Sequence, residues 1–280
     1  MNREQRARIG QATVQILRDG YYTLPDGRVV TLHADLAYAC AETQLYRPSD
    51  YARLIVDLAA LPPNSEATTV TLQAATTLAA ARDLVRGDPS AALLNFASAK
   101  NPGGGFLSGS QAQEESLARA SALYATQQQA PQFYAYHRQH ATCLYSDHLI
   151  FSPSVPVFRD DHDQLLADPW HIGMITAAAV NAGAVRQNEP QRTSEIGPAM
   201  QQRMRMIFAL AAIRGVRSLV LGAWGCGVFR NDPELVATLF ATTLAEPIFA
   251  HRFSAVVFAI YDHSPQQQVW RAFERIFTAN

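Results

Sequence analysis

From about residue 68 onward, short apolar segments alternate with amphipathic ones. The apolar segments predict strands at Val70–Leu72, Ala92–Phe96, Leu149–Phe151, Ile172–Val180, Leu219–Gly222 and Ala255–Ile260. The amphipathic segments predict helices at Thr77–Arg86, Gln113–Gln128, Ser194–Arg214, Pro233–Leu244 and Pro265–Phe277. Residues 152–170 are rich in proline and charge, which predicts a surface loop. Because several strands are apolar at every position, we expect an α/β layer sandwich with a largely buried sheet.

The first 65 residues follow a different pattern, which predicts a helical extension. Apolar residues over Ile9–Leu17 repeat at helical spacing, and Gly20 is a suitable helix stop. A second helix is expected over Ser49–Leu61, with Ser49 as its N-cap and a Pro-Pro pair after it. We therefore divide the chain into an extension, residues 1–65, and an α/β domain, residues 66–280, that forms one structural unit.

Composition excludes several classes of protein. The chain has 280 residues, of which 48% are hydrophobic and 17% charged, as in a globular protein. Its 23 basic and 24 acidic residues give no electrostatic case for binding DNA or a membrane surface. Cys40, Cys143 and Cys226 are too far apart in sequence for a disulfide framework or a CxxC zinc pattern. Without a signal peptide or a long apolar stretch, we expect a cytoplasmic protein in a reducing compartment.

The end of the strand Ala92–Phe96 carries the most informative chemistry. Asn101 and Pro102 are followed by three consecutive glycines, Gly103, Gly104 and Gly105, and seven residues later Gln113, Glu114 and Glu115 begin a helix. Consecutive glycines let the backbone approach a ligand, and ligands of α/β sheets bind at the carboxyl ends of strands. The plain alternative is a tight turn followed by acids that complement a helix N-terminus. Adjacent helical residues point roughly 100° apart, so both glutamates cannot face the core, which favours a functional role.

A second glycine-rich loop follows the strand Leu219–Gly222. It consists of Gly225, Cys226, Gly227, Val228 and Phe229, and Asp232-Pro233 then provides good helix-start chemistry. The two glycines permit backbone amides to converge on phosphate oxygens, and the Phe229 ring can pack on a sugar face. Cys226 has no histidine within its motif, which favours a small packing residue over a nucleophile.

Together, the two loops resemble the poly(ADP-ribose) glycohydrolase family in its smaller bacterial-type form. The glycines, the seven-residue spacer and the Gln-Glu-Glu triplet match the signature GGG-x(6–8)-QEE, and residues 225–229 match the Gly-x-Gly-Val/Ile-Phe/Tyr loop of macrodomains. The resemblance implies a macrodomain-like three-layer α/β/α sandwich with a mixed sheet and an N-terminal helical extension. Residues 66–280 would then be a macrodomain-like catalytic domain.

The resemblance also implies an activity, the hydrolysis of ribose–ribose O-glycosidic bonds of poly(ADP-ribose) to release ADP-ribose. The implied partners are poly(ADP-ribose) and ADP-ribose as substrate and product, and ADP-ribosylated proteins that carry them. We expect no metal or other cofactor, no membrane partner and no direct DNA binding. Two alternatives stay open: a reader that holds ADP-ribose without cleaving it, and a hydrolase that removes mono-ADP-ribose from protein or nucleic acid. The Gln-Glu-Glu triplet favours an enzyme, because a reader needs no acid beside the ribose.

The resemblance assigns roles to the loop residues. Glu115 would be the general acid that protonates the leaving 2′-oxygen and then activates water, and Glu114 would orient Glu115 and the ribose hydroxyls. Asn101 would hydrogen-bond the distal ribose, and Gln113 belongs to the same substrate-binding set. The amides of Gly103–Gly105 and Gly225–Val228 would bind the diphosphate, while Phe229 would flank the distal ribose.

Other polar residues carry weaker signals. Gln73, Thr76 and Thr77 follow a strand where macrodomains bind adenine, but helix capping by a threonine is the favoured interpretation. Asn181 follows the strand Ile172–Val180 and is a further candidate for ligand contact. His33 with Asp35, His137 with His140, and the Asp160–Asp163 run contain metal-binding residue types; their spacing favours a solvated surface.

Overall fold

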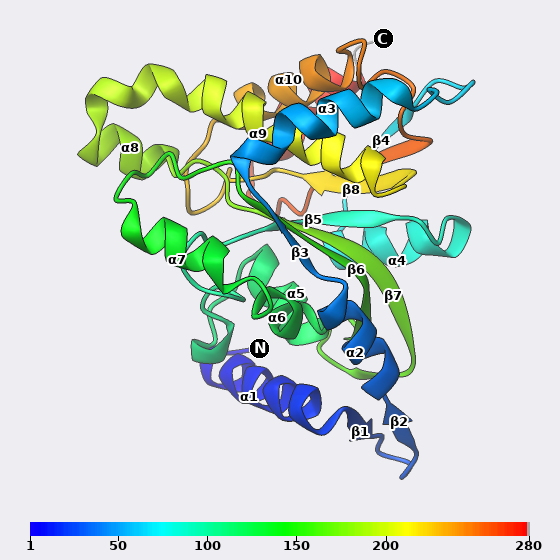
Figure 1. Cartoon of the computed structure of the whole chain (residues 1–280). Coiled ribbons are helices and arrows are strands. Elements are labelled where there is room, and N and C mark those ends of the chain that lie inside the picture. The colour runs from blue at the N-terminus through cyan, green and yellow to red at the C-terminus, as the bar shows by residue number, and fades with distance from the viewer. Residues whose placement is uncertain (279–280) are drawn as a thin grey trace.

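The structure, a computed structural model, describes residues 1–278, and a seven-stranded mixed sheet lies at its centre (Figure 1). In spatial order the strands are β3 (Gln44–Tyr46), β6 (Leu149–Arg159), β7 (Leu165–Ala177), β5 (Ala92–Phe96), β8 (Ser218–Gly222), β9 (Ala255–Ala259) and β4 (Thr69–Gln73). Strands β7, β5, β8, β9 and β4 are parallel, and β6 is antiparallel to both of its neighbours. The carboxyl ends of five strands therefore lie along one edge of the sheet, where α/β proteins bind ligands.

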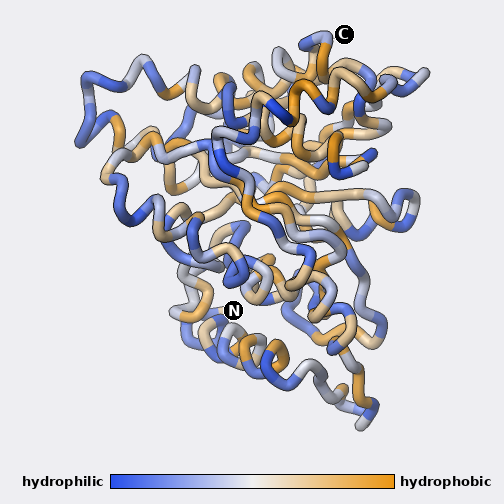
Figure 2. Tube along the Cα trace, in the orientation of Figure 1, coloured by the Kyte–Doolittle hydropathy of each residue, from blue (hydrophilic) through white to orange (hydrophobic). Residues whose placement is uncertain are grey.

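Helices cover both faces of the sheet, which confirms the three-layer α/β/α prediction. One layer contains α3 (Tyr51–Ala60), α9 (Ile196–Ile213), α10 (Pro233–Leu244) and α11 (Gln268–Phe277), and the other contains α4 (Thr77–Gly87), α5 (Gln113–Ala120) and α6 (Leu123–Gln127). Alternate strand residues serve the two cores: Leu94 packs in the first and Leu93 in the second. Figure 2 accordingly shows hydrophobic segments along the central strands.

Two predicted segments differ from the structure. The surface loop predicted over residues 152–170 is wrong, because β6 and β7 continue through it as a long antiparallel hairpin. A register shift between Ser152 and Val155 accommodates Pro153 within the strand. The single helix predicted over Gln113–Gln128 is divided into α5 and α6. It breaks at Ser121, whose extended backbone forms a bridge with Val157 of β6.

The N-terminal segment contributes to the same sheet and layers. It contains α1 (Arg3–Asp19), the ribbon β1 (Tyr21–Thr23) and β2 (Val29–Thr31), α2 (His33–Ala41), β3, the 3-10 turn η1 (Pro48–Asp50) and α3. Gly20 ends α1 in a left-handed conformation (φ 71°), as predicted. Ser49 lies inside η1, so it is not the N-cap of α3. The division at residue 65 stays a prediction, and the last two residues of the predicted domain lie outside the described range.

In the N-terminal segment β1, α2 and β3 were not anticipated. Within residues 66–278 four further elements were not anticipated: η2 (Phe106–Ser108), α7 (Pro131–Gln139), α8 (Ala182–Asn188) and η3 (Pro190–Glu195). These four elements were missed because the sequence of α7 has no clear apolar stripe and because η2, α8 and η3 are short. No helix within residues 1–278 is long and apolar enough to cross a membrane.

Helix α1 holds the segment that follows the glycine run. The Nε atoms of Arg3 and Arg6 donate to the carbonyl oxygens of Ser108 and Gly109, each at 2.9 Å. The buried Thr13 hydroxyl donates to the last turn of α5, at the Arg119 carbonyl oxygen, over 2.8 Å. The extension is therefore a structural support for the loop and the helix that carry the glutamates.

Candidate active site

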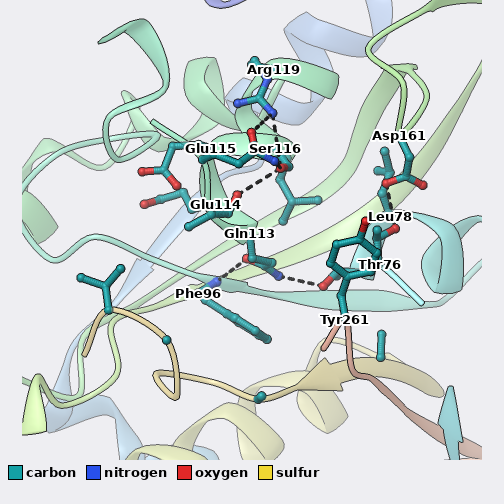
Figure 3. Close-up of a pocket in the computed structure, with 18 of the residues that line it drawn as sticks. Thr76, Leu78, Phe96, Gln113, Glu114, Glu115, Ser116, Arg119, Asp161 and Tyr261 are labelled. Atoms are coloured by element: carbon teal, nitrogen blue, oxygen red, sulfur yellow. Dashed lines mark hydrogen bonds between the residues drawn. The ribbon is translucent and has the colours of Figure 1, made fainter. Parts of the chain in front are cut away.

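A cavity of about 960 Å³ lies at the carboxyl ends of the parallel strands. Helix α5 supplies Glu114 and Glu115 to its wall, and the loop between β8 and α10 supplies residues 225–229. Thr76, Asp161 and Tyr261 lie at the end away from the glutamates (Figure 3). The glutamate pair that follows the first loop and the second loop itself thus flank one cavity, although they are more than a hundred residues apart.

Gln113 fastens the start of α5 to the end of β5. Its side-chain oxygen accepts from Phe96 N at 2.9 Å, and its Nε2 donates to the Leu94 carbonyl oxygen at 2.8 Å and to the Thr77 hydroxyl at 3.2 Å (Figure 3). Gln113 lines the cavity, but its amide group is already used within the protein. We interpret it as a clip that fixes where the two following glutamates emerge.

The backbone amides of the glycine run hold side chains of the site. Gly105 N donates to Glu115 Oε1 at 2.9 Å, Gly103 N donates to Gln127 Oε1 at 2.7 Å, and Gly104 N donates to the Asn101 carbonyl oxygen at 3.0 Å. Gly104 has φ 59°, and a Cβ there would lie 2.5 Å from Glu115 Oε1. Only glycine fits this position, because it must adopt φ > 0 and leave room for a carboxylate.

Glu114 is buried and held by three N–H donors. Ser98 N donates to Oε2 at 2.6 Å, while Asn95 Nδ2 and Gln127 Nε2 donate to Oε1 at 3.1 and 2.8 Å. Burial raises the pKa of Glu114 to about 7, and the charge of Glu115 acts in the same direction, whereas the three donors oppose the shift. Near neutral pH, the Glu114 carboxyl group is therefore present in both its protonated and its ionised form.

Glu115 is placed differently from its neighbour. It is half-buried and lines the cavity, and the Gly105 amide is its only hydrogen-bond partner within residues 1–278. Its carboxylate is thus anchored at one oxygen and open to a ligand at the other. Of the two carboxylates, Glu115 is the one that can meet a reacting atom in the cavity.

The second loop leaves its amides free. Gly227 N, Val228 N and Phe229 N have no acceptor within residues 1–278, and Val228 is 82% exposed. A Cβ added at Gly227 would meet nothing within 4 Å, so this backbone is open to a ligand. Three successive residues that line the cavity thus have unused amide donors, a combination suited to binding an anion.

Asn231 shapes this loop from behind. The side chain is buried, and its Nδ2 donates to the Val180 and Gly225 carbonyl oxygens at 2.7 and 3.0 Å. Gly225 has φ 78°, and a Cβ there would lie 2.5 Å from Asn231 Nδ2. Burial raises the pKa of the Cys226 thiol to about 12, so it stays protonated, and its side chain packs against the core. The packing interpretation of Cys226 therefore fits its surroundings better than a nucleophile.

Several sequence-based assignments do not fit the geometry. Asn101 and Gly103–Gly105 do not line the cavity. The amides of the three glycines were expected to bind a diphosphate. The Gly103 and Gly105 amides instead donate to the side chains of Gln127 and Glu115. Thr76 caps α4 by accepting from Ala79 N at 3.0 Å, as favoured, and its hydroxyl also donates to Asp161 at 2.7 Å.

Some of the weaker candidates lie outside the cavity lining, whereas Thr77 and the Asp160–Asp163 run belong to it. Asn181 caps α8 by accepting from Ala184 N at 3.1 Å, and neither it nor Gln73 lines the cavity. Within the described part of the chain, no three His, Cys, Asp or Glu residues form a group that could hold a metal ion.

Sequence reasoning missed the residues that support the glutamates. Asn95 is a polar residue in an otherwise apolar buried strand, and that contrast was a usable signal. Gln127 belongs to a run of three glutamines and had no distinguishing feature. Arg119 forms a buried ion pair with Asp163 at 3.1 Å, which ties α5 to the β6–β7 hairpin. Arg119 had no distinguishing feature, and Asp163 was considered only within the Asp160–Asp163 run of metal-binding residue types.

Comparison with known proteins places this site among related ones. Residues 10–160 match the catalytic domain of microbial-type PARG. The crystal structure of poly(ADP-ribose) glycohydrolase from Thermomonospora curvata is similar at TM-score 0.93 and 47% identity, covering 98% of this chain and 100% of that one. Its complex with the inhibitor ADP-HPD is similar at TM-score 0.89 and 47% identity, covering 97% and 99%.

A relative from Deinococcus radiodurans gives a comparable match. The structure of its poly(ADP-ribose) glycohydrolase in complex with ADP-ribose is similar at TM-score 0.84 and 45% identity, covering 89% of this chain and 99% of that one. No curated protein matches the chain.

The raised pKa of Glu114 predicts a pH-dependent stability that Glu114→Gln removes. Between its ordinary value of 4.5 and about 7, the unfolded carboxyl ionises while the folded one stays protonated, so rising pH destabilises the wild type. The free energy of unfolding of Glu114→Gln, minus that of the wild type, should rise by about 3 kcal/mol between pH 4.5 and 8. Urea unfolding across this range measures the difference. Parallel curves for the two proteins would contradict the prediction.

Proposed function

Given that this chain belongs to the microbial-type poly(ADP-ribose) glycohydrolase family, we propose that its cavity holds the terminal ADP-ribose of the polymer with the distal ribose beside Glu115. The protein is a glycohydrolase, with poly(ADP-ribose) as substrate and ADP-ribose as product. The position of Glu115, anchored by one amide and otherwise open to the cavity, is the observation that carries the assignment of the reacting group.

Glu115 acts as the general acid. Cleavage of a ribose–ribose bond requires a proton on the leaving 2′-oxygen while the anomeric carbon develops oxocarbenium character. The open oxygen of Glu115 delivers that proton, and the resulting carboxylate then removes a proton from the attacking water. Both steps use one carboxyl group, because Glu114 is held on both oxygens by protein donors and cannot turn toward the bond.

Glu114 acts as a positioning group. Its three donors fix the carboxyl in a dry part of the wall, and a proton on Glu114 removes a negative charge beside Glu115. That neutrality lowers the cost of bringing a diphosphate close to the pair. The glycine run is also a positioning element, because its amides donate to the Glu115 and Gln127 side chains and not to a ligand.

The amides of residues 227–229 bind the diphosphate. They are unused donors facing the cavity, and backbone N–H groups bind phosphate oxygens without a cationic side chain. The Phe229 ring lies beside Tyr145, with ring centroids 5.9 Å apart, and presents an apolar face to the distal ribose. The diphosphate held there also stabilises the developing positive charge on the ribose.

We also propose that the protein works in the cytoplasm. All three cysteines are free, and burial raises the pKa of the Cys143 and Cys226 thiols. A reducing compartment keeps such thiols unmodified.

Replacing the acid without changing its shape tests the mechanism. Glu115→Gln keeps an oxygen for the Gly105 amide but has no proton to transfer, so release of ADP-ribose from the polymer should be abolished. Affinity for free ADP-ribose should stay within about 1 kcal/mol, because binding uses other groups. Product chromatography and calorimetric titration measure the two quantities. Wild-type turnover in a clean preparation would remove Glu115 from the mechanism.

A branched side chain at Gly227 tests the anion-binding loop. Gly227→Val should weaken ADP-ribose binding by about tenfold or more, since the Cβ points into space that a phosphate would need. Gly197→Val is the matched control, because Gly197 lies in the first turn of α9 with nothing within 4 Å of an added Cβ. Unchanged titration of Gly227→Val would show that the diphosphate binds elsewhere.

An added methyl group at Gly104 tests whether the glycine run positions the acid. Gly104→Ala should lower kcat by about a hundredfold, because the Cβ displaces the Glu115 carboxylate. Gly215→Ala is the control for backbone strain: its φ of 73° is similar, and an added Cβ meets nothing within 4 Å. Both variants should lose stability to a similar extent, but only Gly104→Ala should lose turnover. An equal kcat in the two would overturn this role for the loop.

A further inference from the structure

Three exposed cations adjoin the two glycine-rich loops, in sequence or by contact: Lys100, Arg186 and Arg230, here called the rim cluster. Lys100 is the only lysine in the chain and directly precedes Asn101 and the glycine run. Arg230 follows Phe229, which lines the cavity, and Arg186 lies on α8. The cluster therefore combines the edges of both glycine-rich loops.

Direct contacts connect the positions of Arg186 and Arg230. Arg186 Nη1 donates to the Arg230 carbonyl oxygen at 3.0 Å, and a Cβ added at Gly183 would lie 3.1 Å from the Arg230 side chain. Cys143 lies in the same region, because its carbonyl oxygen accepts from Asn181 N, at the start of α8, at 2.9 Å. Burial raises the pKa of the Cys143 thiol, and the positive charge of nearby Lys100 opposes that shift.

The positive charge of the rim cluster is not neutralised. None of its three members forms an ion pair within residues 1–278. The acids of the same region have other partners: Glu189 and Glu195 both pair with Arg192, at 3.3 and 2.8 Å. The Asp232 carboxylate accepts from Glu234 N at the start of α10. Free cations beside a site that opens to solvent attract a polyanion.

We propose that the rim cluster binds a diphosphate of the polymer that remains beyond the scissile bond. The inference rests on the proposed function, which puts the terminal ribose beside Glu115. The leaving 2′-oxygen belongs to an adenosine whose own diphosphate is attached across the same ribose ring. The next two phosphates therefore lie one sugar beyond Glu115, within reach of long cationic side chains at the rim. Arginine and lysine both bind phosphate oxygens, arginine with paired N–H donors.

Binding of a polymer diphosphate at the rim cluster gives the enzyme a higher affinity for the polymer than for the product ADP-ribose. Free ADP-ribose fills the cavity but has no second diphosphate, so the cluster contributes nothing to product binding. A chain gains the additional charge contacts, and their strength falls as salt increases. Substrate is thus favoured over product by groups that never touch the reacting atoms.

The test compares binding of a purified ADP-ribose oligomer and of ADP-ribose, in a Glu115→Gln background that prevents cleavage. The variant changes Lys100, Arg186 and Arg230 to Gln together. The control changes three exposed arginines to Gln: Arg18, Arg53 and Arg217. The control has the same net charge, and its residues lie on α1, on α3 and before the amino end of β8.

The rim variant should bind the oligomer about tenfold more weakly at low salt, with a log Kd–log salt slope reduced by about 1 to 2. Its affinity for ADP-ribose should stay within about twofold. The control should change neither. Equal weakening in both triple variants would reduce the effect to net charge and overturn the proposal, and so would a matching loss for ADP-ribose.

The single lysine allows a test without any change at the rim. An amine-reactive ester should modify the Lys100 side chain, and mass spectrometry of the peptide gives its rate. Bound oligomer should slow that rate about fivefold or more, and saturating ADP-ribose should leave it unchanged. Equal rates with and without oligomer would overturn the proposal even if the triple variant fails to fold. A failure of the proposed function shows separately, as absence of ADP-ribose release by the protein with Glu115 intact.

Discussion

Two adjacent carboxylates on one helix repel each other, and the active site depends on how the protein backbone holds them in different environments. Glu114 is drawn into the wall by Ser98 N, Asn95 and Gln127, while Gly105 N alone holds Glu115. The result is one buried carboxyl whose pKa is raised and one that meets the cavity. Residues of the same type, one position apart, thereby acquire different chemistry.

Glycine has a different structural role in each of the two glycine-rich loops. In the first, glycine makes room for a carboxylate of the protein itself, and the amides are consumed internally. In the second, glycine keeps the backbone bare, and successive amides have no internal acceptor. A count of glycines cannot separate these uses. The difference lies in which side chains the rest of the fold brings to each loop.

Much of the fold follows from local pattern. The strand Ala92–Phe96 and the helix Pro233–Leu244 have the predicted bounds, because apolar periodicity and an Asp-Pro start are local signals. The break at Ser121 is not local, since it depends on pairing with Val157. The β6–β7 hairpin was hidden because Pro153 occupies an irregular position in its ladder. Of the site, both loops and both glutamates were found, whereas Gln127 becomes meaningful only after the chain has folded around Glu114.

The support given by α1 has a consequence for the order of events during synthesis. Arg3 and Arg6 bond to Ser108 and Gly109, and Thr13 bonds to the end of α5, across more than a hundred residues of sequence. Helix α1 therefore waits for its partners until more than a hundred further residues have been made. Contacts of such sequence separation form slowly and late. The segment after the glycine run is thus held by a helix that is made long before it, so the support for the catalytic loop is incomplete until both parts are present.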